Sequence, residues 1–234
     1  MEEKEVPTLP RLNEPAPDFT AKTTLGEIRL SDFKGKWVVL FSHPADFTPV
    51  CSTEFLAFAR RKKAFEELGV QLIGLSIDSI HAHLAWVKDL EEMSGIAIDF
   101  PVIADLDMKV SRLYGMIHPA ASETAAVRAV FIIDPNGILR GMLYYPLTTG
   151  RNIDEILRFI RALQFTDRTG LNTPADWQPG EPAIVKPPPP CLSSRKTRPR
   201  RTSTPSTAAG TCVSRRRSRG KRTAPRVFLG AVSL

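Results

Sequence analysis

The sequence predicts an α/β domain built around a central sheet. Segments rich in β-branched and aromatic residues alternate along the chain with segments whose apolar residues recur at a helical period. The 234 residues are 42% hydrophobic, which is enough for a packed core. No apolar run approaches the roughly 18 residues of a membrane span, and the amino-terminal stretch MEEKEVPTLPRLNEP lacks the pattern of a signal peptide. We therefore expect a soluble, cytoplasmic protein without a membrane partner.

The first elements follow from local patterns. Residues 19–30 are expected to form a short hairpin that turns at Leu25-Gly26, and the continuous apolar run at 37–41 (WVVLF) predicts a buried central strand. Residues 48–68 are expected to form one helix, because their phenylalanines can line up as an apolar stripe. Gly69 is the expected end of that helix.

The next segments continue the alternation. Residues 70–77 (VQLIGLSI) predict a second buried strand, and residues 79–93 predict a helix capped by Ser79. A third strand is expected at 100–104 and a short helix at 108–114.

Two strands and a helix complete the domain. Residues 127–133 and 138–145 are strand-like, and the turn sequence DPNG at 134–137 joins them as antiparallel neighbours. Residues 152–163 (NIDEILRFIRAL) form an amphipathic pattern typical of a closing helix.

The charge is divided unevenly along the chain. The chain carries 32 basic and 25 acidic residues, but residues 187–234 hold 12 of the basic residues and no acidic ones. We expect a domain at 8–166, a carboxyl-terminal extension at 167–190 that uses Trp177 to dock, and a basic, disordered tail at 191–234. Three scattered cysteines, without a CxxC pair, argue against a disulfide scaffold or a zinc site.

The most informative stretch is HPADFTPVCSTEF at 43–55, between a predicted strand and a predicted helix. Thr48 suits the N-cap and Pro49 the first helical position, which puts Cys51 at the third. The helix dipole and the free backbone N–H groups there favour a thiolate, so Cys51 is a candidate nucleophile. The alternative is a small hydrophobic residue packed in the core, since free cysteine is often buried.

These residues resemble a known family. Pro44, Thr48 and Cys51 match the PxxxTxxC motif of peroxiredoxins, and SHPADFTPVCSTEF resembles the one-cysteine, peroxiredoxin-6-like subgroup found in bacteria and archaea. Further matches, among them LSIDS, HLAW, TAAVRAVFIIDPNG, YYPLTTGRNIDEILR and TPADW, extend the resemblance over residues 10–186. The resemblance implies a thioredoxin-like fold with a central mixed β-sheet flanked by helices, plus a carboxyl-terminal extension.

The resemblance also implies an activity and its residues. It implies that Cys51 reduces hydrogen peroxide and alkyl hydroperoxides through a sulfenic acid, with no metal or organic cofactor. By position, Thr48 holds the peroxide, Pro44 shields the thiolate, and Arg128 polarises both groups. The amides near Val50 and Cys51 are further candidate donors for the charge that develops. The family further implies a homodimer, which can be arranged as a decameric ring of dimers.

The supporting residues leave alternatives open. Arg128 lies in the apolar run AAVRAVFII, where a guanidinium needs an anionic partner unless the strand lies at an edge and points it to solvent. Arg151 either braces the site or lies on the surface. His43 either hydrogen-bonds near Cys51 or is satisfied by the backbone. His81 and His83 are two residues apart in a helix and share no face, which argues against a metal site.

The tail departs from the family pattern after Pro190. Cys191 and Cys212 are candidates to resolve the sulfenic acid, and an external thiol of unknown identity is the other candidate. Three interpretations of the segment are open: a divergent resolving arm, a basic tether for anionic polymers, or out-of-frame sequence. If its arginines bind nucleic acid, they do so through phosphates. The alternative function is therefore a non-catalytic thioredoxin-fold binding or scaffold protein with a polyanion-binding tail.

Overall fold

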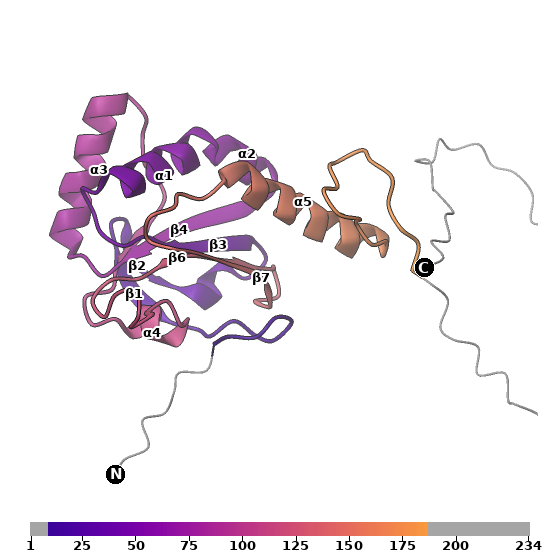
Figure 1. The fold of residues 1–234 in the computed structure, drawn as a ribbon, viewed down its shortest axis with the longest axis horizontal. Coiled ribbons are helices and arrows are strands. Elements are labelled where there is room, and N and C mark those ends of the chain that lie inside the picture. Colours follow the sequence, from indigo (N-terminus) through magenta and orange to yellow (C-terminus); the bar gives the residue numbers. More distant parts are fainter. Residues whose placement is uncertain (1–8, 187–234) are drawn as a thin grey trace, which may run out of the picture. The chain divides into compact units, whose positions relative to one another are not determined.

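A computed structural model of the chain describes residues 9–186. These residues divide into two compact units, the first ending at Leu163 and the second beginning at Gln164. The first unit contains a seven-stranded mixed sheet in the order β2-β1-β5-β4-β3-β6-β7 (Figure 1). The strands are β1 (Thr20–Thr23), β2 (Gly26–Arg29), β3 (Trp37–Ser42), β4 (Val70–Ser76), β5 (Val102–Ala104), β6 (Arg128–Ile133) and β7 (Leu139–Tyr145).

Strand β3 lies near the middle of this sheet and is buried along its whole length. It pairs in parallel with β4 and antiparallel with β6, so that Leu40 lies opposite both Ile73 and Phe131. Its residues alternate between two apolar cores, with Val39 in one and Leu40 in the other. The strand is a continuous apolar run because helices or loops cover both of its faces.

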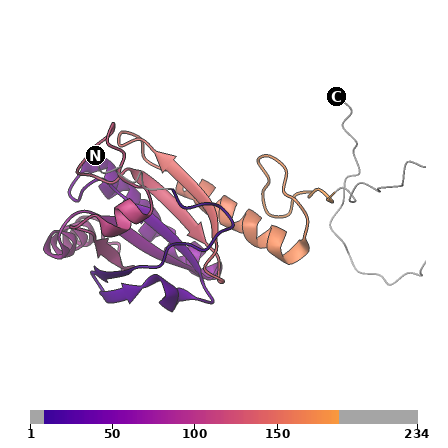
Figure 2. The same cartoon turned by 90° about the horizontal axis from the view of Figure 1, so that it is seen from below.

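The helices form a layer on each face of the sheet (Figure 1). Helices α1, α2, α3 and α5 contribute apolar residues to the core that contains Val39. Helix α4 contributes to the core that contains Leu40. The same layers are seen from below in Figure 2. The helices are α1 (Pro49–Arg60), α2 (Lys62–Glu67), α3 (Ile80–Ser94), α4 (Lys109–Leu113), α5 (Ile153–Thr169) and the 3-10 helix η1 (Leu30–Phe33).

Close packing fixes α1 against the sheet. The Phe41 and Phe58 rings stack with their centroids 4.0 Å apart, and Phe41 meets Phe55 edge to face at 5.4 Å. A Cβ added to Gly74 on β4 would lie only 3.1 Å from Cζ of Phe55, so the glycine permits this close approach. The inward face of α1 is therefore packed closely against β3 and β4.

The predicted elements exist, and three of them differ from the prediction by more than one residue at an end or in their continuity. The single helix expected at 48–68 was wrong, because Arg61 leaves the helical geometry and separates α1 from α2. The Arg61 guanidinium instead binds the Asp154 carboxylate at 2.6 and 2.7 Å. Strand β5 starts only at Val102, because Pro101 has no N–H to donate. Helix α5 runs six residues beyond the predicted end, to Thr169.

The second unit is described as far as Lys186. Asn172 and Ile184 form an isolated antiparallel bridge, and the buried Trp177 ring packs 4.7 Å from the Phe165 ring. Trp177 thus docks within its own unit. The predicted tail at 191–234, with Cys191 and Cys212, lies outside the described residues.

Across residues 9–186, every helix is too short or too polar to cross a bilayer.

Candidate active site

The start of α1 has the geometry that the sequence predicts. Thr48 is the N-cap residue with extended backbone angles, Pro49 occupies the first helical position, and Cys51 is therefore third. The Thr48 side chain does not cap the helix as its type suggested: its hydroxyl donates to the Ala45 carbonyl at 3.0 Å. The hydroxyl oxygen of Thr48 can therefore still accept a hydrogen bond from another donor. The backbone N–H groups in the first turn of α1 receive no cap from this side chain.

The Cys51 thiol is fully buried, at 0% exposure, and belongs to the core that contains Val39. Burial alone agrees with both interpretations of this residue. One polar contact favours the nucleophile, because Nη1 of Arg128 donates to Sγ at 3.4 Å. A guanidinium that donates to a buried sulfur stabilises a thiolate, whereas an apolar cysteine packed in the core needs no cationic partner.

Arg128 and Arg151 converge on one carboxylate. Arg128 Nη1 donates to Glu54 Oε2 at 2.7 Å, and Arg151 donates from Nη2 to the same oxygen at 2.7 Å. Glu54 Oε1 accepts from Nε and from the backbone N–H of Arg151, both at 2.8 Å. All three side chains are almost completely buried. The surface alternatives for the two arginines were therefore wrong, since β6 lies between β3 and β7 and the loop after β7 carries Arg151 inward.

The charges of this network do not balance by themselves. Two guanidinium groups face one carboxylate, which leaves one buried positive charge beside Sγ of Cys51. Burial alone would raise the pKa of Glu54, but the hydrogen bonds and charge of Arg151, followed by the charge of Arg128, hold this pKa below its ordinary value of 4.5. Glu54 is thus ionised at neutral pH, and a Cys51 thiolate would bring the site to neutrality.

Replacing Glu54 with glutamine is expected to lower the free energy of unfolding by about 3–5 kcal/mol, because two buried guanidinium groups lose their counter-ion. The pH dependence has a definite sign. Because the folded pKa is depressed, the stabilisation is present above pH 4.5, the ordinary value, and is lost as the pH falls through the folded value. Urea denaturation at several pH values measures both effects.

The matched control for this change is Glu66→Gln, since Glu66 is 57% exposed in its surface pair with Lys62. This control should change stability by less than about 1 kcal/mol. Equal stability of the Glu54 variant and the wild type at pH 7 would contradict the account of the network.

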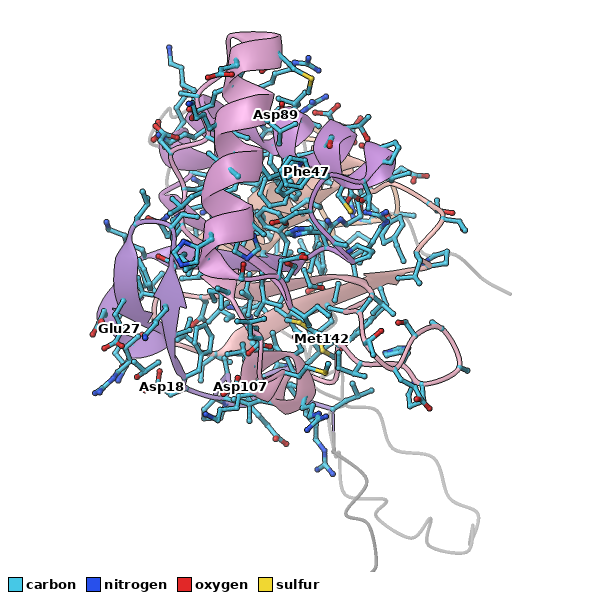
Figure 3. The ribbon with its side chains drawn as sticks, turned by 90° about the vertical axis from the view of Figure 1, so that its left-hand side faces the viewer. Asp18, Glu27, Phe47, Asp89, Asp107 and Met142 are labelled. Atoms are coloured by element: carbon cyan, nitrogen blue, oxygen red, sulfur yellow. The ribbon has the colours of Figure 1, made fainter. Side chains whose placement is uncertain are left out.

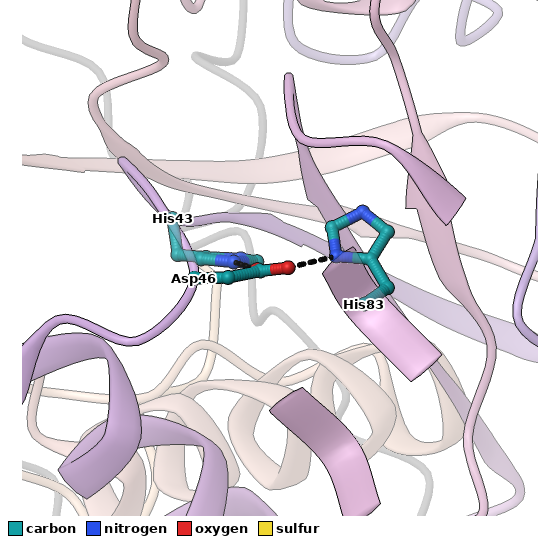
Figure 4. A group of neighbouring side chains, drawn as sticks. All are labelled: His43, Asp46 and His83. Atoms are coloured by element: carbon teal, nitrogen blue, oxygen red, sulfur yellow. Dashed lines mark hydrogen bonds and ion pairs between the residues drawn. The ribbon is translucent and has the colours of Figure 1, made fainter. Parts of the chain in front are cut away.

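His43 is buried beside the motif, and its side chain is not satisfied by the backbone, which was one of the two alternatives. Its Nε2 bonds Oδ1 of Asp46 at 2.8 Å, while Oδ2 of Asp46 bonds Nδ1 of His83 at 2.7 Å (Figure 4). His81 is exposed and His83 buried, so the two do point away from each other as predicted. The connection of His83 to His43 through Asp46 was not predicted from the sequence. The ligand atoms of these three residues lie within 4.8 Å of one another.

The remaining predicted residues lie around the start of α1. Pro44 and Val50 are half-buried. The loop after β7 comes close to Val50, since a Cβ placed on Gly150 would lie 3.5 Å from Val50 Cγ1. The shielding role of Pro44 and the donor role of the Val50 amide stay predictions.

Glu54 is the main residue of this site that the sequence analysis missed. A signal for it exists, because Glu54 follows Cys51 by three residues and immediately precedes Phe55, on the inward face of α1. A carboxylate on that face needs a cationic partner, as did Arg128 in its apolar strand.

Family models match this chain in two places. The model of the AhpC/TSA family matches residues 12–142. A second model, the C-terminal domain of 1-Cys peroxiredoxin, matches residues 162–192.

Two curated relatives illustrate the similarity in sequence. The peroxiredoxin of Aquifex aeolicus is 62% identical over 176 residues, which are 75% of this chain and 79% of that protein. Peroxiredoxin 2 of Caldanaerobacter subterraneus is 59% identical over 180 residues, 77% of this chain and 81% of that protein.

Solved structures agree with these relatives. A yeast mitochondrial 1-Cys peroxiredoxin, studied for thiol resolution via glutathione/thioredoxin systems, has a TM-score of 0.70 and 42% identity over 75% of this chain and 86% of its own. Peroxiredoxin 6 of Arenicola marina has a TM-score of 0.71 and 40% identity, over 79% and 86% of the two chains. The sheet and helices described above match this thioredoxin-like fold.

Proposed function

The chain belongs to the AhpC/TSA family of peroxiredoxins, and from this membership we propose that Cys51 is the sulfur that reacts with peroxide. The protein is a thiol-dependent peroxidase with an antioxidant function. The observation that carries the assignment to Cys51 is the hydrogen bond from Arg128 Nη1 to Sγ, at 3.4 Å, in a buried network with excess positive charge.

The proposed reaction uses these groups in order. The Cys51 thiolate attacks one oxygen of the peroxide, the O–O bond breaks, and the other oxygen leaves as hydroxide or alkoxide and takes a proton. Sulfur is oxidised to sulfenic acid, and the peroxide is reduced to water or an alcohol. Arg128 and the amides of Val50 and Cys51 are the donors we assign to the developing negative charge. They are held in place before reaction, so little reorganisation is needed.

Thr48 and Pro44 are proposed to shape the peroxide site. The Thr48 hydroxyl already donates to Ala45, so its oxygen is left to accept the O–H of a peroxide. Pro44 is half-buried in the same loop, where we assign it the role of keeping water from the thiolate. Arg151 acts through Glu54, which it holds against Arg128.

A thiol reductant completes the cycle by converting the sulfenic acid back to a thiol. We propose an external thiol, of the glutathione or thioredoxin kind used by the yeast relative, as the reductant. Cys191 and Cys212 are the candidates for resolution within the protein. A homodimer, or a decameric ring of dimers, in the cytoplasm also stays a proposal.

Counting the peroxide consumed per chain tests this function. With excess dithiothreitol the protein should consume many equivalents of hydrogen peroxide, and without a reductant about one equivalent per chain before the rate collapses. The alternative of a non-catalytic binding or scaffold protein, which the comparisons do not favour, predicts that consumption stops at the same point with dithiothreitol present. That outcome would contradict turnover.

A further inference from the structure

A second buried polar cluster lies beside the motif, formed by His43, Asp46 and His83 (Figure 4). The two histidine side chains are 0% exposed and the Asp46 side chain 2%. Asp46 bridges the rings, accepting from His43 Nε2 on one oxygen and from His83 Nδ1 on the other. The second nitrogen of His83, Nε2, lies 3.0 Å from the Ile103 carbonyl on β5. The cluster therefore joins the loop at 43–48 to α3 and β5.

The three residues have the donor types of a zinc site, but the distances between their nitrogen and oxygen atoms fit hydrogen bonds rather than a shared metal ion. The two nitrogen-to-oxygen distances are 2.8 and 2.7 Å, which are direct hydrogen bonds. Ligands that each lie about 2.0–2.2 Å from a tetrahedral metal are separated from one another by roughly 3.3 Å or more. To bind a metal ion, these side chains would have to move apart and break both hydrogen bonds.

The ring of His83 is held at both of its nitrogens. Nδ1 faces a carboxylate oxygen of Asp46, and Nε2 faces the Ile103 carbonyl. His43 has a hydrogen-bond partner only at Nε2, because its Nδ1 has none among residues 9–186. Asp46 is thus the group that the two rings share, and His83 connects it to β5.

The electrostatics of the other two members agree with this arrangement. Burial lowers the pKa of His43 below its ordinary value of 6.5, and the hydrogen bond and charge of Asp46 do not fully offset it. Burial alone would raise the pKa of Asp46, but the hydrogen bonds from His43 and His83 hold it below 3.8. Asp46 is therefore ionised and His43 neutral at neutral pH.

Asp46 also anchors the backbone that leads to Cys51. Its N–H donates to Oδ2 of Asp78 at 3.0 Å, and the next residue, Phe47, has a φ of 57° although it is not glycine. Phe47 is 57% exposed and labelled in Figure 3, so its own side chain contributes little to holding this strained conformation. The side-chain bonds of Asp46 hold the turn together with this N–H bond and the bond from the Thr48 hydroxyl to Ala45, and α1 follows directly from the turn.

We propose that Asp46 and His83 are positioning residues for the peroxide reaction, and that the buried hydrogen bond between them holds the loop at 43–48 in its reactive conformation. The proposal rests on the assignment of Cys51 as the reacting sulfur. Cys51 is fully buried, so the position of Thr48 and of the first turn of α1 decides whether peroxide meets Sγ in a productive geometry.

The decisive variants are His83→Asn, Asp46→Asn and the pair combined. An asparagine amide can replace the Nδ1–H donor to Asp46 but lacks the second ring nitrogen that meets the Ile103 carbonyl. The matched controls are His81→Asn and Asp89→Asn, which change the same residue types at exposed positions of α3. Two quantities are measured at pH 7: the second-order rate of Cys51 oxidation by hydrogen peroxide, and amide hydrogen exchange in residues 43–55 of the reduced protein.

We expect each single variant to lower the oxidation rate at neutral pH by about tenfold or more, because the loop is misplaced. The double variant should be no worse than either single one, since both break the same pair. Amide exchange should accelerate in residues 43–55 and stay unchanged in β6. The controls should behave as the wild type.

Three results would overturn the proposal. The first is unchanged exchange and an unchanged rate in both single variants. The second is faster exchange throughout β6 as well, which would indicate a general loss of stability. The third is stoichiometric zinc in the purified protein that disappears with His83→Asn, which would replace the protons by a metal. Failure of the proposed function looks different, because a Cys51→Ser protein would then still turn over peroxide.

Discussion

Replacing Cys51 with serine is expected to abolish peroxide turnover with dithiothreitol, lowering kcat/KM by at least about 10³-fold. A serine hydroxyl stays protonated at neutral pH and is a weak nucleophile without an adjacent base. The groups found around Sγ, chiefly Arg128 at 3.4 Å, are donors that cannot take a proton from serine. The measurement is the initial rate of hydrogen peroxide loss at several peroxide concentrations.

The control for this prediction is the double variant Cys191→Ser/Cys212→Ser. With dithiothreitol, a small thiol that reaches the sulfenic acid directly, this variant should retain turnover close to that of the wild type. Substantial activity in Cys51→Ser would show that the reacting sulfur lies elsewhere, and loss of activity in the double variant alone would move it to the tail.

Replacing Arg128 with methionine is expected to lower kcat/KM for hydrogen peroxide by about 10²–10³-fold, the usual cost of removing one fixed donor to developing charge. The fold should tolerate this change. Arg151 continues to bind both oxygens of Glu54, and methionine fills much of the space of the arginine stem. Steady-state kinetics together with urea denaturation separates lost catalysis from lost stability.

The matched control is Arg140→Met on the neighbouring strand β7, where Arg140 pairs with Asp134 at 3.1 Å. That variant also loses an ion pair of a β-strand arginine, but far along the sheet from the start of α1, and its peroxide kinetics should match the wild type. A rate loss of less than about threefold in Arg128→Met would contradict the role of the guanidinium.

Most of the fold could be predicted from the sequence because its signals are local. The apolar run of β3, the Ser79 cap of α3 and the DPNG turn each specify their element through a few adjacent residues. The separation of α1 from α2 could not be predicted in this way. It goes with the ion pair between Arg61 and Asp154, which are 93 positions apart.

The candidate site could likewise be predicted only where adjacent residues specify it. The placement of Cys51 at the third position of α1 follows from Thr48 and Pro49 alone, and the structure has it there. The sequence also indicates that Arg128 needs an anionic partner, but identifying Glu54 requires knowledge of how β6 packs on α1. The bond from Asp46 to His83 spans 37 positions and joins a loop to a helix, so only the tertiary structure discloses it.

The central claim, that Cys51 is the sulfur oxidised by peroxide, is tested most directly by locating the first oxidised atom. The reduced protein is treated with one equivalent of hydrogen peroxide without a reductant, in the presence of a dimedone-type reagent that traps sulfenic acid. Peptide mass spectrometry then shows which cysteine carries the adduct. We predict the adduct on Cys51. An unmodified Cys51 with the adduct on Cys191 or Cys212 would contradict the account.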